Sequence, residues 1–144
     1  MINFLDNVFG VADEYFKDEK EFRHFGGNHL NKLINKHCRK DMTVIDGDCI
    51  QHKINLNGKE YIRDIEYKHH KDSMSQVQLN LLLRRAKDAK IVMEHEPDQV
   101  RQVYIIQSDY PFQRNNIVKN LITGASKTLN YDDFIKFLNF ELEV

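Results

Sequence analysis

The sequence has no long hydrophobic run and almost no cysteine. None of its apolar stretches approaches the roughly 20 residues of a membrane-spanning helix. Its N-terminus, which includes Asp6, lacks the basic start and apolar stretch of an export signal. Cys38 and Cys49 have no neighbours at the spacing of a zinc site. These absences predict a cytoplasmic protein with reduced thiols and no membrane contact.

The chain also lacks the strong positive charge of a protein that coats nucleic acid. Its formal net charge is -1, with 21 basic and 22 acidic side chains. Basic residues are nevertheless concentrated in the middle of the chain, where they comprise Lys68, His69, His70, Lys71, Arg84, Arg85, Lys87 and Lys90. A local positive field of this kind suits an enzyme that holds phosphates only around its cleft.

Nothing in the sequence divides it into parts. There is no internal repeat, low-complexity tract or long linker, and the 144 residues are 41% hydrophobic and 30% charged. This composition and length are typical of a soluble globular protein. We therefore expect residues 1–144 to form one domain.

The spacing of apolar residues predicts a fold of the broad α/β class, more specifically an α+β arrangement of helices and a mixed sheet. Periods of three to four residues predict helices over 3–22, 28–40, 76–90 and 131–142, with Ser73 or Ser75 capping the third. Runs rich in β-branched and aromatic residues predict strands over 42–45, 49–56, 60–68 and 103–107. A strand, helix, strand order after a hairpin permits a parallel crossover. The expected fold is a mixed sheet of about four strands with helices flanking it.

The chemistry-bearing residues gather on the predicted hairpin. Side chains in a strand alternate between its faces, so Glu66 and Lys68 point the same way, and Asp64 shares that face. Asp46 and Asp48 precede the first strand of the hairpin, whose turn is Asn57-Gly58. Several carboxylates beside a lysine suit a divalent cation next to a phosphate.

The register of that hairpin decides which aspartate joins Glu66. An ideal two-residue turn sets Glu66 opposite Cys49 and points Asp48 to the other face. A bulge or a three-residue loop would bring Asp48 back to the face of Glu66. Asp46 has the same parity as Asp48 and is the alternative if the alignment differs by one pleat.

Three short segments resemble the PD-(D/E)XK nuclease superfamily. Residues 47–50 resemble its first acidic element, with glycine where proline often stands, and residues 66–68 match its E-x-K element. Residues 74–78 are similar to a signature of phage and VRR-NUC-type members, in which a small polar residue opens a helix and a glutamine follows three positions later. The resemblance covers roughly residues 42–107.

The resemblance implies a restriction-endonuclease-like core and a small endonuclease that hydrolyses the phosphodiester bonds of DNA. Asp48 and Glu66 would bind one or two Mg²⁺ ions, for which Mn²⁺ could substitute, and the backbone carbonyl of Tyr67 would add a ligand. Lys68 would position the attacking water and stabilise charge on the phosphate. Gln78 would bridge Lys68 and a substrate phosphate.

Further residues join this predicted site. Asp46 replaces Asp48 as the metal ligand in the shifted register, and an N-terminal acid, Glu14, Glu19 or Glu21, would complete the site as in some family members. Contacts with nucleic-acid phosphates are expected from His69, His70, Lys71, Arg84 and Arg85.

Other functions remain open on the sequence alone. The same site would hydrolyse RNA, because none of these residues reads a 2′-hydroxyl. A nuclease-like fold without catalysis that binds nucleic acid or a protein is the alternative from another class. Aromatic residues near Tyr110 and Phe112 leave a homodimer open.

Overall fold

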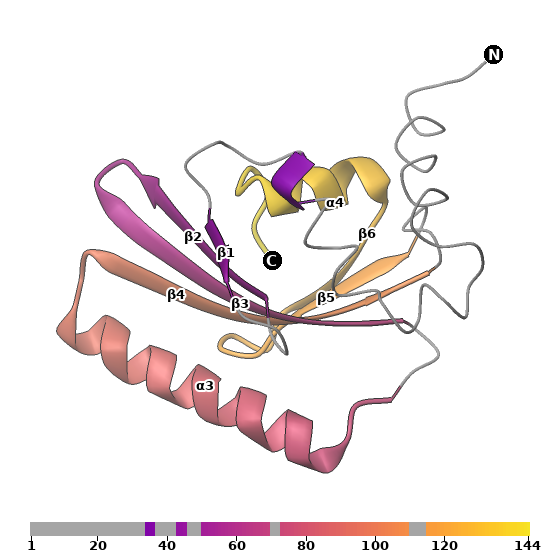
Figure 1. Cartoon of the computed structure of the whole chain (residues 1–144), viewed down its shortest axis with the longest axis horizontal. Coiled ribbons are helices and arrows are strands. Elements are labelled where there is room, and N and C mark those ends of the chain that lie inside the picture. Colours follow the sequence, from indigo (N-terminus) through magenta and orange to yellow (C-terminus); the bar gives the residue numbers. More distant parts are fainter. Residues whose placement is uncertain (1–33, 37–42, 46–49, 70–72, 110–114) are drawn as a thin grey trace.

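The computed structural model describes residues 34–36, 43–45, 50–69, 73–109 and 115–144 (Figure 1). Within them, a mixed sheet separates two helices, as the sequence predicted. The strands are β1 (Thr43–Ile45), β2 (Ile50–Leu56), β3 (Lys59–His69), β4 (Gln99–Ser108), β5 (Asn116–Asn120) and β6 (Ser126–Leu129). The helices are α3 (Gln76–His95) and α4 (Tyr131–Leu138). All four predicted strands are present, and β5 and β6 were not predicted.

The strands lie in the sheet in the order in which they occur in the chain, from β1 to β6. Neighbours are antiparallel except for β3 and β4, which are parallel over ten residue pairs from Glu60–Gln99 to His69–Ser108. Helix α3 makes the connection between these two strands. The predicted parallel crossover after an antiparallel hairpin is therefore confirmed. Because the two strands are parallel, the C-terminal ends of β3 and β4 lie side by side.

The turn of the β2–β3 hairpin fixes its register. Asn57 and Gly58 have φ values of 52° and 83°, the left-handed conformation that a two-residue type I′ turn requires. Pairing then continues without a bulge from Leu56–Lys59 to Ile50–Ile65. The ideal two-residue turn is the one that forms.

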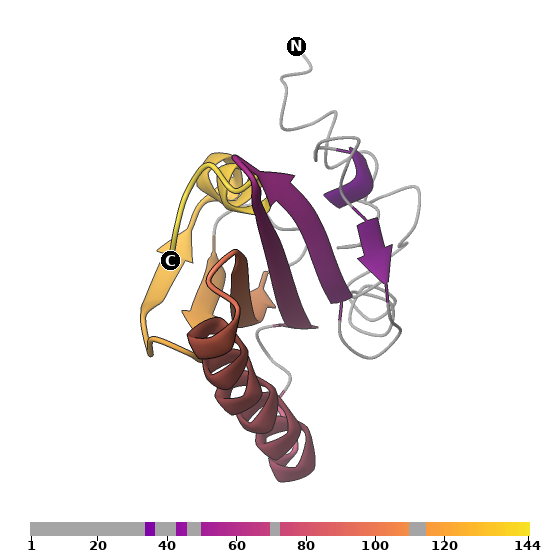
Figure 2. The same cartoon turned by 90° about the vertical axis from the view of Figure 1, so that its left-hand side faces the viewer.

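Helix α3 covers one face of the sheet (Figures 1 and 2). It begins at a capping box, in which the Ser75 hydroxyl accepts a hydrogen bond from the Gln78 backbone N–H at 3.2 Å. Leu82, Ala86 and Ala89 are buried on its inner side and pack with Val103 of β4. The predicted helix over 76–90 is confirmed and continues to His95.

Helix α4 lies on the opposite face, where most of the core is found (Figure 1). Its N-cap is Asn130, whose side chain accepts a hydrogen bond from the Asp133 backbone N–H at 2.9 Å. Phe134, Phe137 and Leu138 are fully buried against strand residues such as Ile65, Tyr104 and Val118. Each such side chain contributes about 2 kcal/mol by leaving water. The aromatic stripe of this helix is core, as predicted.

A buried arginine joins β3 to the end of α4. Arg63 has no exposed surface, and its guanidinium donates hydrogen bonds to the Phe137 carbonyl at 2.8 Å and to the Gln102 Oε1 at 3.0 Å. The same group lies 3.8 Å from the ring centroid of Phe140 and 5.1 Å from that of Tyr104. The positive charge of Arg63 is therefore buried in the core, where hydrogen-bond acceptors and aromatic rings surround it.

Several predicted elements and residues lie outside the described residues. These are the helix over 3–22, most of the helix over 28–40, both cysteines, and Tyr110 with Phe112. Residues 34–36 are helical, and Ile34 belongs to the core under α4. Neither α3 nor α4 has the length and apolar character needed to cross a bilayer.

Candidate functional site

Three charged residues of β3 share the face that α3 covers. Asp64, Glu66 and Lys68 pair along β4 with Val103, Ile105 and Gln107, and the first two of these β4 residues pack beside α3. The shared face that strand alternation predicted is therefore present. Asp64 is 9% exposed, whereas Glu66 and Lys68 are half-buried. Exposure increases toward the end of the strand.

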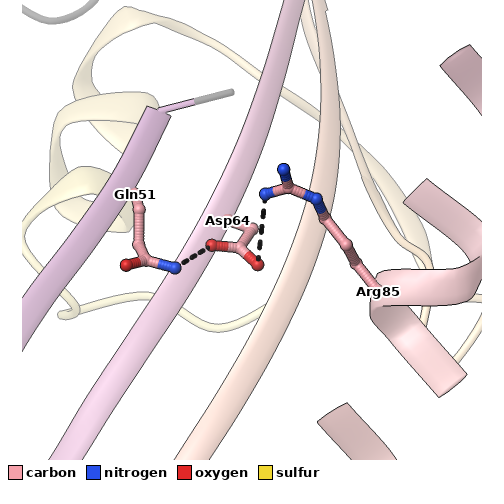
Figure 3. A network of polar contacts seen from close by, with 3 residues as sticks. All are labelled: Gln51, Asp64 and Arg85. Atoms are coloured by element: carbon pink, nitrogen blue, oxygen red, sulfur yellow. Dashed lines mark hydrogen bonds and ion pairs between the residues drawn. The ribbon is translucent and has the colours of Figure 1, made fainter. Parts of the chain in front are cut away.

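Asp64 is tied into the scaffold from two sides (Figure 3). Its Oδ1 accepts a hydrogen bond from Gln51 Nε2 of β2 at 2.7 Å, and its Oδ2 lies 3.9 Å from Arg85 Nη1 of α3. These contacts join two strands and the helix immediately before Glu66 on the same face. Because both carboxylate oxygens have protein partners, Asp64 is a poor candidate for a metal ligand.

Glu66 and Lys68 stand beside β4 at the end of the parallel pair. Glu66 is in register with Ile105, and Lys68 is in register with Gln107. Two residues of a strand span about 7 Å, so the carboxylate and the ammonium reach one common volume. On the other side of β3, the last described pair of the hairpin is Ile50–Ile65.

Asp46 and Asp48 lie outside the described residues, and the choice between them remains a prediction. The regular register ends at its last described pair, Ile50–Ile65. If it continued unchanged by one residue, Cys49 would lie opposite Glu66, and either aspartate would face Glu66 only through a change of register within 46–49.

The described residues do not form a complete cation site by themselves. Among residues 34–36, 50–69, 73–109 and 115–144, no three His, Cys, Asp or Glu side chains are grouped to hold a metal ion. Glu66 supplies a carboxylate of the type that Mg²⁺ takes as a ligand. A second acid would have to come from a segment such as 46–49.

The side chain of Tyr67 points away from this site. It is 8% exposed, belongs to the core under α4, and burial raises the pKa of its hydroxyl well above the ordinary value of 10.0. Only its backbone carbonyl would serve as a metal ligand, as the resemblance implied.

Gln78 is exposed at the start of α3, where it forms the second half of the capping box. Its Oε1 accepts a hydrogen bond from the Ser75 backbone N–H at 3.4 Å. This bond is long, and its rupture would leave an exposed N–H that water satisfies. The bridging role toward Lys68 stays a prediction that competes with the cap.

The expected phosphate contacts divide into four cases. His69 is 2% exposed on the α4 face, because strand alternation turns it away from Lys68, and its contact with a phosphate stays a prediction that this burial disfavours. Arg85 is 42% exposed but carries the ion pair with Asp64. Arg84 is exposed on α3. His70 and Lys71 lie outside the described residues.

A pocket of about 190 Å³ opens beside Lys68, between the first turns of α3 and the sheet. Its polar lining consists of Lys68, Gln107, Lys119 and Ser126, and its apolar lining of Met74, Leu79, Ile105 and Ile117. Sequence reasoning missed Gln107, Lys119 and Ser126. Gln107 ended a predicted strand and its pairing with Lys68 was within reach, whereas the other two lie on or beside strands that were not predicted.

No family model matches the chain, and no curated protein or solved structure matches it. The resemblance to the PD-(D/E)XK superfamily therefore rests on the motif residues and their order along the chain.

Proposed function

We propose that the chain is a small metal-dependent endonuclease that hydrolyses phosphodiester bonds of DNA. The observation that carries the proposal is the placement of Glu66 and Lys68. They lie on one face of β3, at the end that α3 leaves partly open, and Lys68 lines a pocket together with a second lysine, Lys119. An acid on the same strand face as an ammonium that lines such a pocket suits phosphodiester hydrolysis.

In this proposal Glu66 holds Mg²⁺ together with Asp48 or Asp46, and the Tyr67 carbonyl adds an oxygen. When bound, the ion would supply positive charge at the phosphate and activate water as a nucleophile. Lys68 would orient the attacking water toward phosphorus and stabilise the charge that grows on the phosphate oxygens. Asp64, fixed by Gln51 and Arg85, keeps this part of β3 in place.

The experiment compares matched variants in a cleavage assay. Plasmid DNA, single-stranded DNA and RNA are incubated with the protein and Mg²⁺ or Mn²⁺, and EDTA serves as the blank. Glu66→Gln and Lys68→Met should each lower the cleavage rate on the order of a hundredfold or more. Lys87→Gln and Glu94→Gln, exposed on α3, should leave the rate unchanged.

Folding must be verified for every variant by its thermal unfolding curve. Cleavage at the wild-type rate in either Glu66→Gln or Lys68→Met would refute the proposed site. Binding of DNA by the wild-type protein without cleavage would favour the non-catalytic alternative, and a preference for RNA would change the substrate.

The same assay decides between the two aspartates. Asp48→Asn and Asp46→Asn each remove one carboxylate at nearly constant size. The aspartate that completes the cation site should be the one whose loss matches that of Glu66→Gln.

A further inference from the structure

Beyond β3, which carries Glu66 and Lys68, the neighbouring strands β4 and β5 add the polar side chains of Gln107 and Lys119. Lys119 of β5 is in register with Ile105 of β4, which is in turn in register with Glu66 of β3. Two strand spacings, about 10 Å, therefore separate Lys119 from Glu66 along one row. In the next row Gln107 lies beside Lys68. All of these residues lie on the face that α3 covers.

The two lysines of this pocket are available to a ligand. Within the part of the chain that the structure describes, neither the Lys68 nor the Lys119 ammonium has an ion pair or a hydrogen bond. No acidic side chain of the described residues lines the pocket. A cavity with two unneutralised ammonium groups attracts an anion.

Two other pockets differ in charge. One of about 460 Å³, at the opposite end of β3, is lined by Glu60, Glu96 and Asp98 without a basic residue. The other, beneath the middle of α3, mixes Asp64 and Asp88 with arginines. The charge of the pocket beside Lys68 therefore differs from that of the other two.

The shape of the lining indicates what kind of anion fits. On the strand side, Lys68, Gln107 and Lys119 supply polar groups beside the apolar Ile105 and Ile117. Met74 and Leu79, just before and within the first turn of α3, form an apolar wall. Inorganic anions need no apolar wall. A nucleic-acid backbone presents a charged phosphate joined to a largely apolar sugar, which matches both sides of the pocket.

We propose that this pocket is a subsite for the phosphate next to the scissile one, with Lys119 and Gln107 as its ligands. This inference rests on the proposed nuclease function. Lys119 contacts substrate and holds the backbone in line, while Lys68 acts at the neighbouring phosphate. The chain thus binds at least two successive phosphates across β3, β4 and β5.

The test uses Lys119→Gln with Lys127→Gln as its control. Lys127 is exposed on neighbouring β6 but is in register with buried Val118, so it faces away from the pocket. Binding of a fluorescein-labelled oligodeoxynucleotide to the full chain is measured by anisotropy in EDTA at several salt concentrations. Lys119→Gln should weaken binding on the order of tenfold and lower the salt slope by about one, whereas Lys127→Gln should match wild type.

A set of oligonucleotides, each with one neutral methylphosphonate linkage, locates the contact. At one linkage the wild-type and Lys127→Gln proteins should lose affinity, while Lys119→Gln should lose nothing further, because the lysine and the phosphate charge are one interaction. Under Mg²⁺, Lys119→Gln should raise KM on the order of tenfold with kcat nearly unchanged.

Failure of the subsite and failure of the nuclease proposal give different results. Equal binding by Lys119→Gln and Lys127→Gln in a protein that cleaves DNA overturns the subsite and leaves the nuclease intact. Selective weakening in a protein that does not cleave upholds the subsite and removes the enzyme. Absence of wild-type binding to the oligonucleotide overturns the subsite.

Discussion

The two faces of β3 treat charge in opposite ways. On the α4 face Arg63 is fully buried, and hydrogen bonds and aromatic rings surround its guanidinium. On the α3 face Glu66 and Lys68 are half-buried, and Lys68 lines a pocket. Because buried charge is costly unless it is paired, a charge inside the core serves the fold, and a charge at the margin of a helix can serve a ligand.

Between these extremes lies Asp64. It is on the same face as Glu66 but under the middle of α3, where the helix supplies Arg85 as a partner. On this face, coverage by α3 therefore distinguishes the paired Asp64 from the more exposed Glu66 and Lys68. The following experiments test this division, beginning with the face where the largest effect is expected.

Removal of the buried guanidinium should be the most damaging change. Arg63→Ala leaves the Phe137 carbonyl and the Gln102 side chain without their donor. It also opens a cavity between the rings of Tyr104, Phe137 and Phe140, so we expect a loss of about 3 kcal/mol or more in the free energy of unfolding. Urea unfolding measures the loss, and exposed Arg84→Ala should change it by less than about 0.5 kcal/mol. Equal effects of the two variants would contradict the comparison. Arg63→Lys, which keeps the charge but not the planar fork, should fall between them.

His52, which lies on the α4 face of the sheet, should make the free energy of unfolding depend on pH. Burial, and then the charge of Arg63 opposite it on β3, lowers its pKa from 6.5 to about 3. Since the unfolded chain takes up this proton near pH 6.5 and the folded chain only near pH 3, stability falls as the pH drops through that window. From pH 7 to pH 5 the loss is about 2 kcal/mol.

Urea unfolding at several pH values shows whether His52 is responsible. His52→Gln should flatten the pH dependence between pH 7 and pH 5, whatever its stability at pH 7. The exposed His95→Gln should keep the wild-type slope. A wild-type slope in His52→Gln would show that another group titrates.

The smallest effect should come from the ion pair between Asp64 and Arg85. Its two atoms lie 3.9 Å apart and Arg85 is 42% exposed, so solvent weakens the attraction. In a double-mutant cycle with Asp64→Asn and Arg85→Gln, we expect a coupling energy of about 0.2–1 kcal/mol that decreases in high salt. A coupling well above that range would mean that α3 shields this pair as fully as the core shields Arg63.

Strand alternation and turn chemistry made much of this arrangement predictable. The Asn57-Gly58 turn, the shared face of Glu66 and Lys68 and the parallel crossover follow from the sequence pattern, which also limited the helix cap to Ser73 or Ser75. Strand β5 was not predicted because polar residues occupy buried positions in it and an apolar residue occupies an exposed one. Asn116 and Asn120 occupy buried positions, where their side-chain amides bond to backbone carbonyls, while Ile117 is exposed.

Other features depend on contacts between segments that are far apart in the sequence. Nothing near His69 in the sequence signals that its side of β3 is covered while that of Lys68 stays accessible. Gln78 likewise matched a family signature, and the structure engages it in the helix cap. Lys119 and Lys68 line the same pocket because β5 and β3 both pair with β4, which the sequence did not predict for β5.

The two-residue turn at Asn57-Gly58 has a consequence for how such a chain can change over time. One residue inserted there would transfer every side chain of β2 to the opposite face, so Gln51 would lose Asp64 and His52 would leave the core. Mutations that change the length of the turn and mutations in β2 are therefore not independent. In descendants of this sequence, the length of the turn and the alternation of residue types along β2 should be inherited as a pair.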